Sequence, residues 1–62
     1  MRIDIKKFQL AQAKSGKTLI ALGIPRETTR NIREGKNLRP ETVGKIAKAL
    51  SCMPEDIVAE DF

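Results

Sequence analysis

Histidine is absent from this chain of 62 residues, and cysteine occurs only once, at Cys52. A single cysteine forms no disulfide within the chain, and a structural zinc site needs about four cysteine or histidine ligands. Catalysis that depends on histidine is excluded as well. We interpret Cys52 as a small buried filler, and its unpaired thiol favours a reducing cytoplasm over secretion. Stability must therefore come from packed helices, with dimerisation as the available supplement.

Long apolar segments are also lacking. Residues 1–7 contain no apolar core of the kind that signal peptides carry, and no run approaches the roughly 18 apolar residues of a membrane span. We therefore expect a cytoplasmic protein without membrane contact. The chain has no repeat, linker or low-complexity stretch, and its length is near the lower limit for a domain that folds alone. One domain, residues 1–62, is the expected organisation.

Positive charge is concentrated in the first 54 residues. The chain has twelve lysine and arginine residues against eight aspartate and glutamate residues, a formal net charge of +4. Four of the acidic residues lie at the C-terminal end, 55–62, which contains no basic residue, so residues 1–54 carry twelve bases, four acids and a net charge of +8. A compact basic body favours a polyanionic partner, with plain solubility as the competing interpretation. The acidic end is consistent with weaker non-specific binding or with an interface.

The spacing of apolar residues is helical throughout, and no sustained alternation indicates a strand. Asp4 is a suitable N-cap for a first helix from Ile5 to about Lys14. Thr18 is a suitable cap for a short second helix, Leu19–Leu22, which Gly23 ends. These signals predict two helices joined by a short connection.

Three further helices are predicted after Gly23. Pro25 suits the first turn of a third helix, which reaches Arg33 or Glu34 and is followed by Gly35. Pro40 opens a fourth helix, whose apolar stripe consists of Val43, Ile46, Ala47 and Leu50. Gly44 inside this helix costs roughly 1 kcal/mol relative to alanine, so we expect close packing there. A last helix from Pro54 to about Ala59 offers Ile57 and Val58 to the core. Five short helices predict a compact all-α domain.

The second and third helices form a recognisable pair. A capped helix, a turn containing glycine and a second helix rich in Arg, Thr and Asn are typical of helix-turn-helix DNA binding. Ile32 is expected to seat the third helix on the domain, with Ile24 just outside it and Thr29 partly buried. Four polar side chains then face outward, those of Arg26, Glu27, Arg30 and Asn31.

Four segments in this order resemble the phage-repressor and Cro helix-turn-helix family, which is lambda-repressor-like (XRE-like), over residues 5–58. They are Lys-Ser-Gly-Lys-Thr at 14–18, Gly-Ile-Pro-Arg-Glu-Thr at 23–28, Ile-Arg-Glu-Gly-Lys at 32–36 and the segment 39–50. The last is similar to the family's fourth helix, and its Lys-Ile-Ala-Lys-Ala-Leu core is the most specific signal. The resemblance implies a five-helix domain containing a helix-turn-helix, and a sequence-specific transcriptional regulator, repressor-like, of a phage or mobile element.

By position within the resemblance, the third helix is the recognition helix. Its residues that match base contacts are Arg26, Glu27 and Asn31, with Arg30 beside them. The chemistry agrees, because arginine binds guanine O6 and N7 bidentately, asparagine binds adenine and glutamate accepts from cytosine N4. As competing interpretations, Arg26 and Arg30 form a solvated face or pair with Glu27 or Glu34. Glu27 near a helix N-terminus is also stabilised by the helix dipole without DNA.

Phosphate contacts, which set register rather than sequence, match the loop after the recognition helix, at Lys36, Asn37 and Arg39. Lys17 and Thr18 are the weaker candidates, since the interval between Gly16 and Gly23 is shorter than usual in the family by about one helical turn.

Two further positions depart from the family. Pro25 stands where a serine or threonine usually contacts phosphate. Gln12 and Arg33 stand where an arginine and a glutamate usually form an ion pair, so that pair is absent.

The sequence therefore predicts a regulator without catalytic residues that binds double-stranded DNA as a homodimer. No metal, no cofactor and no membrane contact are expected. The expected dimer surface follows Leu50 and includes Met53, Ile57, Val58 and Phe62. The alternative from another class is a protein-interaction module of the same fold, an anti-repressor or antitoxin, which the short second helix, Pro25 and the acidic end favour.

Overall fold

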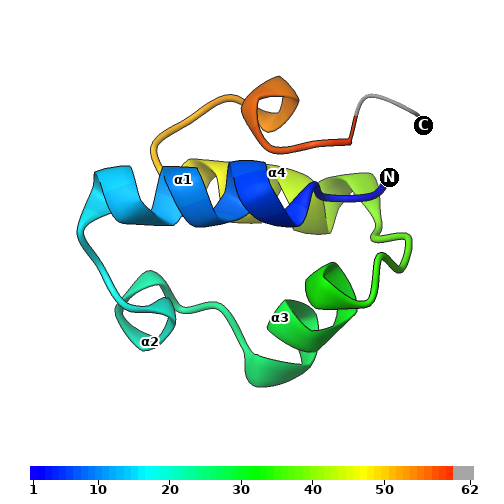
Figure 1. The fold of residues 1–62 in the computed structure, drawn as a ribbon, viewed down its shortest axis with the longest axis horizontal. Helices are drawn as coiled ribbons and strands as arrows, with labels where there is room; N and C mark the ends of the chain where they lie inside the picture. The colour runs from blue at the N-terminus through cyan, green and yellow to red at the C-terminus, as the bar shows by residue number, and fades with distance from the viewer. Residues whose placement is uncertain (60–62) are drawn as a thin grey trace.

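The computed structural model describes residues 1–59, which form four α-helices and one turn of 3-10 helix (Figure 1). The elements are α1 (Ile5–Ser15), α2 (Leu19–Leu22), α3 (Arg26–Arg33), α4 (Pro40–Ala49) and η1 (Pro54–Asp56). The predicted all-α fold is confirmed, and the bounds of the first three helices and the start of the fourth agree with the expected ones to within one residue. None of these helices is long and apolar enough to cross a membrane.

Side-chain caps fix the starts of the first two helices as predicted. The backbone N–H of Lys7 donates to Oδ1 of Asp4 at 3.0 Å, and that of Ala21 donates to Oγ1 of Thr18 at 3.1 Å. Each cap satisfies one of the N–H groups that a helix start leaves without an intrahelical partner. α2 has four residues, and Gly23 ends it at φ 74°, in the left-handed region that favours glycine.

Each α-helix except α2 contributes buried side chains to the core. Phe8 of α1, Ile32 of α3 and Val43 of α4 are almost completely buried, and Ile57 joins them from the segment after η1. Full burial of such a side chain stabilises the fold by about 1.5–3 kcal/mol. The predicted stripe of α4 is confirmed, since all of its members are buried: Val43, Ile46, Ala47 and Leu50. α2 contributes only two half-buried leucines at the edge of this core, Leu19 and Leu22.

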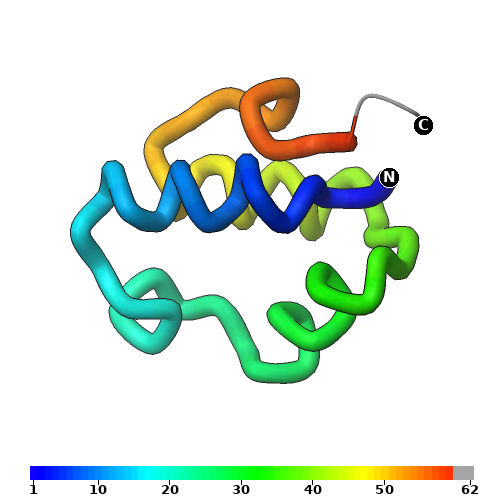
Figure 2. The backbone as a smooth tube through the Cα atoms, in the orientation of Figure 1, coloured from blue at the N-terminus to red at the C-terminus, as the bar shows by residue number. Residues whose placement is uncertain are grey.

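The two ends of the described chain pair with each other, as Figure 2 shows for the N-terminal segment and the segment after η1. Ile3 and Val58 form an isolated antiparallel β-bridge. The N–H of Asp4 donates to the carbonyl of Ile57 at 2.8 Å, and the N–H of Ala59 donates to the carbonyl of Arg2 at 2.9 Å. We call this pairing of residues 2–4 with 57–59 the terminal seam.

The terminal seam corrects two expectations. The last helix does not run to Ala59: only Pro54–Asp56 is helical, and Ile57 leaves the helix at φ −124° to join the seam. Ile57 and Val58 are buried within their own chain, so they form no dimer surface, whereas Met53 is 60% exposed. Phe62, the other residue expected at a dimer surface, lies outside the described residues.

Gly44 is the third correction. A Cβ atom built on Gly44 would meet nothing within 4 Å, so the expectation of close packing at this position is wrong. The residue lies in the middle of α4, and only the helix propensity of glycine distinguishes it from alanine there.

Candidate nucleic-acid interface

A short closed turn joins α2 to α3. The N–H groups of Gly23 and Ile24 donate to the carbonyls of Ile20 and Leu19 at 3.0 and 3.1 Å, which satisfies the end of α2. The chain then reaches Pro25, the N-cap of α3, at φ −64° and ψ 153°. Pro25 thus precedes the first turn of the helix by one position. Its carbonyl accepts the N–H of Thr29 at 3.1 Å and the Thr29 hydroxyl at 3.3 Å.

Three buried side chains hold α3 on the domain, and they are the three predicted from the sequence. Ile24, Thr29 and Ile32 are each less than a tenth exposed. Thr29 is the buried polar member, and its hydroxyl is satisfied by the Pro25 carbonyl, so its burial leaves no unpaired donor. The face of α3 opposite these residues is left to the solvent or to a partner.

The outward face of α3 carries the residues predicted to contact bases. Arg26, Glu27 and Arg30 are exposed, and Asn31 is half-buried. Neither arginine forms an ion pair with Glu27 or Glu34 among the residues that the structure describes; Glu34 pairs instead with Lys36, at 3.1 Å between Oε1 and Nζ. The guanidinium groups of the recognition helix are therefore available to a ligand. That they contact bases remains a prediction.

The loop after α3 presents the residues predicted to contact phosphates. Lys36, Asn37 and Arg39 are all exposed. Leu38 between them is half-buried and anchors the loop to Met1 through two hydrogen bonds. The N–H of Leu38 donates to the carbonyl of Met1 at 2.6 Å, and the N-terminal ammonium of Met1 donates to the carbonyl of Leu38 at 2.9 Å. This anchor was not predicted, since no local pattern connects positions 1 and 38. An anchored loop holds basic side chains at a fixed distance from the recognition helix, as phosphate clamping requires.

Lys17 and Thr18, the weaker phosphate candidates, are exposed at the start of α2. The Thr18 hydroxyl oxygen is used as the helix cap. Its proton remains able to donate to an anion. Gln12 holds the segment between α1 and α2 in place, because its Nε2 donates to the Lys17 carbonyl at 3.3 Å.

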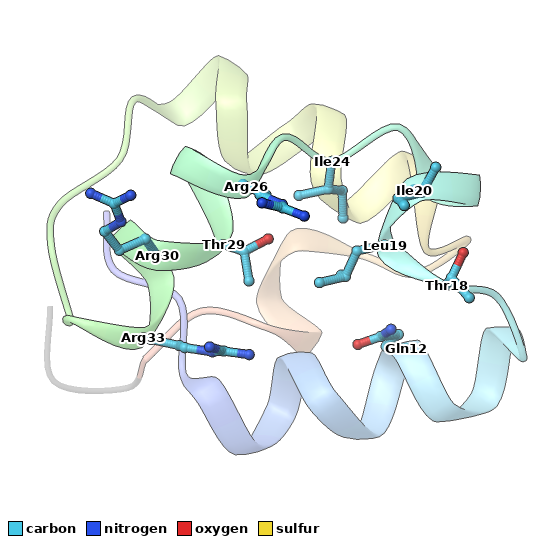
Figure 3. Close-up of a pocket in the computed structure, with 9 residues that line it drawn as sticks. All are labelled: Gln12, Thr18, Leu19, Ile20, Ile24, Arg26, Thr29, Arg30 and Arg33. Atoms are coloured by element: carbon cyan, nitrogen blue, oxygen red, sulfur yellow. The ribbon is translucent and has the colours of Figure 1, made fainter.

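Three arginines follow one another along α3 at i, i+4 and i+7, namely Arg26, Arg30 and Arg33. This spacing places them on one flank of the helix. They line an open hollow of about 610 Å³ between α1, α2 and α3, which we call the interhelical hollow (Figure 3). Its lining residues are Gln12, Thr18, Leu19, Ile20, Ile24, Arg26, Thr29, Arg30 and Arg33.

The arginines differ in direction. The side chains of Arg26 and Arg33 extend over the hollow, toward α2 and α1 respectively, whereas that of Arg30 points away from it (Figure 3). Arg33 was expected only as the position of a missing ion pair, and its place beside the hollow was not predicted. The i, i+4, i+7 spacing was the signal that could have shown it.

Two of the three comparisons with known proteins gave no match. Neither the curated proteins nor the solved structures include a significant match to this chain. The sequence profile of the Cro/C1-type helix-turn-helix DNA-binding domain, by contrast, matches residues 2–59. This match spans all four α-helices, η1 and both halves of the terminal seam. The chain therefore belongs to the family of Cro/C1-type helix-turn-helix DNA-binding domains.

Proposed function

We propose that this DNA-binding domain is a sequence-specific, repressor-like transcriptional regulator that inserts α3 into the major groove. The observation that carries the proposal is the division of α3 into two faces. Thr29 and Ile32 are buried against the domain, while Arg26, Glu27 and Arg30 are exposed and free of ion pairs in the described chain. A helix seated in this way can present the donors and acceptors that read base edges.

The recognition helix and the loop after it have separate tasks. Arg26 and Arg30 suit guanine, Asn31 suits adenine and Glu27 suits cytosine, each good bidentate pair discriminating by about 1–3 kcal/mol. Lys36, Asn37 and Arg39, held by the anchored Leu38, suit phosphates and set the register. Lys17 and Thr18 are candidates for a further phosphate on the other side of the recognition helix.

A homodimer is part of the proposal. One α3 with eight residues contacts few base pairs, so two copies on half-sites about 34 Å apart are the expected route to useful affinity. The burial of Ile57 and Val58 moves the proposed dimer surface to the exposed residues around Met53. Analytical ultracentrifugation with and without a palindromic site measures the assembly.

Fluorescence titration of labelled duplexes at several salt concentrations tests the proposal, with the preferred site first selected from random sequences. We expect one preferred sequence, together with affinity that falls steeply with the logarithm of the salt concentration. Absence of binding even at about 50 mM salt would contradict the regulator.

A protein-interaction module, such as an anti-repressor or antitoxin, is the second candidate. The observation in its favour is Ile20 on α2, an aliphatic side chain that is 89% exposed beside the interhelical hollow. Ile20 lies beside the half-buried Leu19 and is bordered by polar side chains such as Thr18, and apolar surface with a polar rim is typical of interaction sites. The DNA titration separates the two candidates, because the module requires no preferred sequence.

A further inference from the structure

The interhelical hollow joins an apolar wall to a basic one. Leu19, Ile20 and Ile24 supply aliphatic surface from α2 and the turn after it, and Arg26 and Arg33 extend over the opening from α3 (Figure 3). Because α2 has a single turn, it leaves this part of α1 and α3 uncovered. The volume of about 610 Å³ falls within the range of roughly 300–1,000 Å³ that small-molecule sites occupy.

The two arginines of the basic wall have no acidic partner within the part of the chain that the structure describes. Neither Arg26 nor Arg33 forms an ion pair or a side-chain hydrogen bond within residues 1–59, and none of the residues that line the hollow is acidic. Guanidinium groups bind carboxylates through short, charge-assisted and often bidentate hydrogen bonds. The charge of the hollow is thus complementary to an anion.

The apolar wall narrows the chemistry of that anion. A phosphate or a free inorganic anion would satisfy the guanidinium groups but leave Ile20, at 89% exposure, in water. An aliphatic chain attached to a carboxylate would cover Leu19 and Ile20 and remove apolar surface from water, which is favourable in proportion to the area covered. A single molecule can therefore pair with the arginines and also cover the apolar wall only if it is amphipathic.

We propose that the interhelical hollow binds a small aliphatic carboxylic acid, with the carboxylate on Arg33 and the hydrocarbon chain against Leu19, Ile20 and Ile24. Arg26, which extends over the same hollow, supplies the second positive charge. Arg26 is also a proposed base-contacting residue, so an occupied hollow and a bound operator compete for its guanidinium group. A ligand that displaces the operator in this way acts as an inducer. This inducer role rests on the proposed function, whereas binding of the acid to the hollow does not.

Titration of the full chain without DNA, followed by amide chemical shifts in two-dimensional NMR, tests the binding. The probes are acetate, hexanoate and octanoate, the last kept below its micellar concentration, with 1-octanol as the uncharged match. We expect saturable shifts at residues 18–24 and 26–33, with affinity rising by about threefold or more for each added CH₂. 1-Octanol should bind to the hollow at least about tenfold more weakly than octanoate. Equal shifts with octanol, or shifts spread over the whole chain, would overturn the proposal.

Two variants with the same change of charge locate the carboxylate. Arg33→Gln removes the guanidinium group at the hollow, and Lys45→Gln removes an exposed charge on α4, outside it. We expect Arg33→Gln to weaken octanoate binding about tenfold and Lys45→Gln to change it by less than about twofold. Equal losses would show general electrostatic attraction and overturn the site. Far-ultraviolet circular dichroism of both variants verifies that each remains helical.

Competition with DNA is measured separately. Octanoate should raise the apparent Kd for the selected duplex in the parent chain and have about tenfold less effect in Arg33→Gln. If the parent binds octanoate but no DNA, the proposed function fails and the ligand site stands. If it binds DNA but octanoate leaves the NMR spectrum unchanged, the ligand site fails and the regulator stands.

Discussion

Gln12 of α1 and Arg33 of α3 direct their side chains toward each other across the interhelical hollow, and no hydrogen bond joins them (Figure 3). Gln12 uses its amide nitrogen to hold the Lys17 carbonyl at 3.3 Å instead. Family members usually place an ion pair at these positions. Among the described residues, α1 and α3 are therefore joined by the core cluster that contains Phe8 and Ile32, without a polar contact between Gln12 and Arg33. The guanidinium group of Arg33 is left available to a ligand.

Restoring the ion pair should strengthen the connection between α1 and α3. The double variant Gln12→Arg with Arg33→Glu is expected to show a favourable coupling of about 0.3–1 kcal/mol, the range for exposed pairs. Urea unfolding of the parent, both single variants and the double variant gives this coupling as a double-mutant cycle. A coupling near zero would mean that the two side chains do not reach each other.

Gly44→Ala should stabilise the domain. A new Cβ meets nothing within 4 Å, and alanine is favoured over glycine inside a helix by about 0.5–1 kcal/mol. The matched control is Gly23→Ala, at φ 74°, where the left-handed backbone should make the same substitution destabilising by about 1 kcal/mol or more. Thermal unfolding should show opposite shifts of Tm, and a destabilising Gly44→Ala would indicate a packing constraint at α4.

Ser51→Gly should also be stabilising. Ser51 lies at φ 57° just after α4, the one residue other than glycine with a positive φ in the described chain. Its N–H donates to the carbonyl of Lys48 at 3.1 Å, and that of Cys52 donates to the carbonyl of Ala47 at 3.0 Å, so the helix end depends on this conformation. We expect a gain of about 0.5–1 kcal/mol in the free energy of unfolding. Ser51→Ala, which keeps the strain, should give no such gain.

Arg26→Ala and Lys36→Ala should affect DNA binding in different ways. Loss of a base contact relaxes the preference at one position of the site, whereas loss of a phosphate contact weakens all sequences alike and reduces the salt slope by about one unit. Titrations against the selected duplex and its single-base variants measure both effects. If Arg26→Ala leaves the base preference unchanged, α3 is not placed in the groove as proposed.

Cys52 should give the domain a small alkaline instability. Partial burial, and secondarily the Asp56 carboxylate, raise the pKa of the Cys52 thiol above its ordinary value of 9.0, against a smaller opposing effect of Lys14. Folding then favours the protonated thiol. This contribution is complete below the pKa of the unfolded chain and is lost as the pH rises toward the folded pKa.

The measurement is urea unfolding at several alkaline pH values. Above about pH 8.5, the free energy of unfolding should fall more steeply in the parent than in Cys52→Ala. Parallel curves for the two proteins would show that the thiol titrates alike in the folded and unfolded chains.

The helices were predictable because their signals are local. Asp4 and Thr18 cap backbone groups three residues ahead, and such short-range hydrogen bonds leave a clear trace in the sequence. The buried seat of α3, Ile24 with Thr29 and Ile32, was predictable for the same reason, since helical spacing decides which face is apolar.

Contacts between distant positions were not predictable in this way. Nothing near Ile57 indicates that Ile3 and Asp4 will pair with its segment and end the last helix. The empty surroundings of Gly44 depend on packing around the whole of α4. The interhelical hollow, too, depends on how far a one-turn α2 leaves α1 and α3 uncovered. The short α2 itself was predictable from the sequence, but the exposure of Arg33 beside the hollow depends on how α1 and α3 pack around it.

The terminal seam also sets the order in which the protein can fold during synthesis. The helix-turn-helix pair is translated early, but Ile3 has no bridge partner until Val58 has been made, and the carbonyl of Arg2 awaits the N–H of Ala59. Domains generally fold as units once their last contacts are available. A nascent chain stalled before residue 57 would thus lack Ile57 in the core and leave the first strand-like residues exposed. The complete core, to which Ile57 belongs, therefore forms only once residues 57–59 have been synthesised.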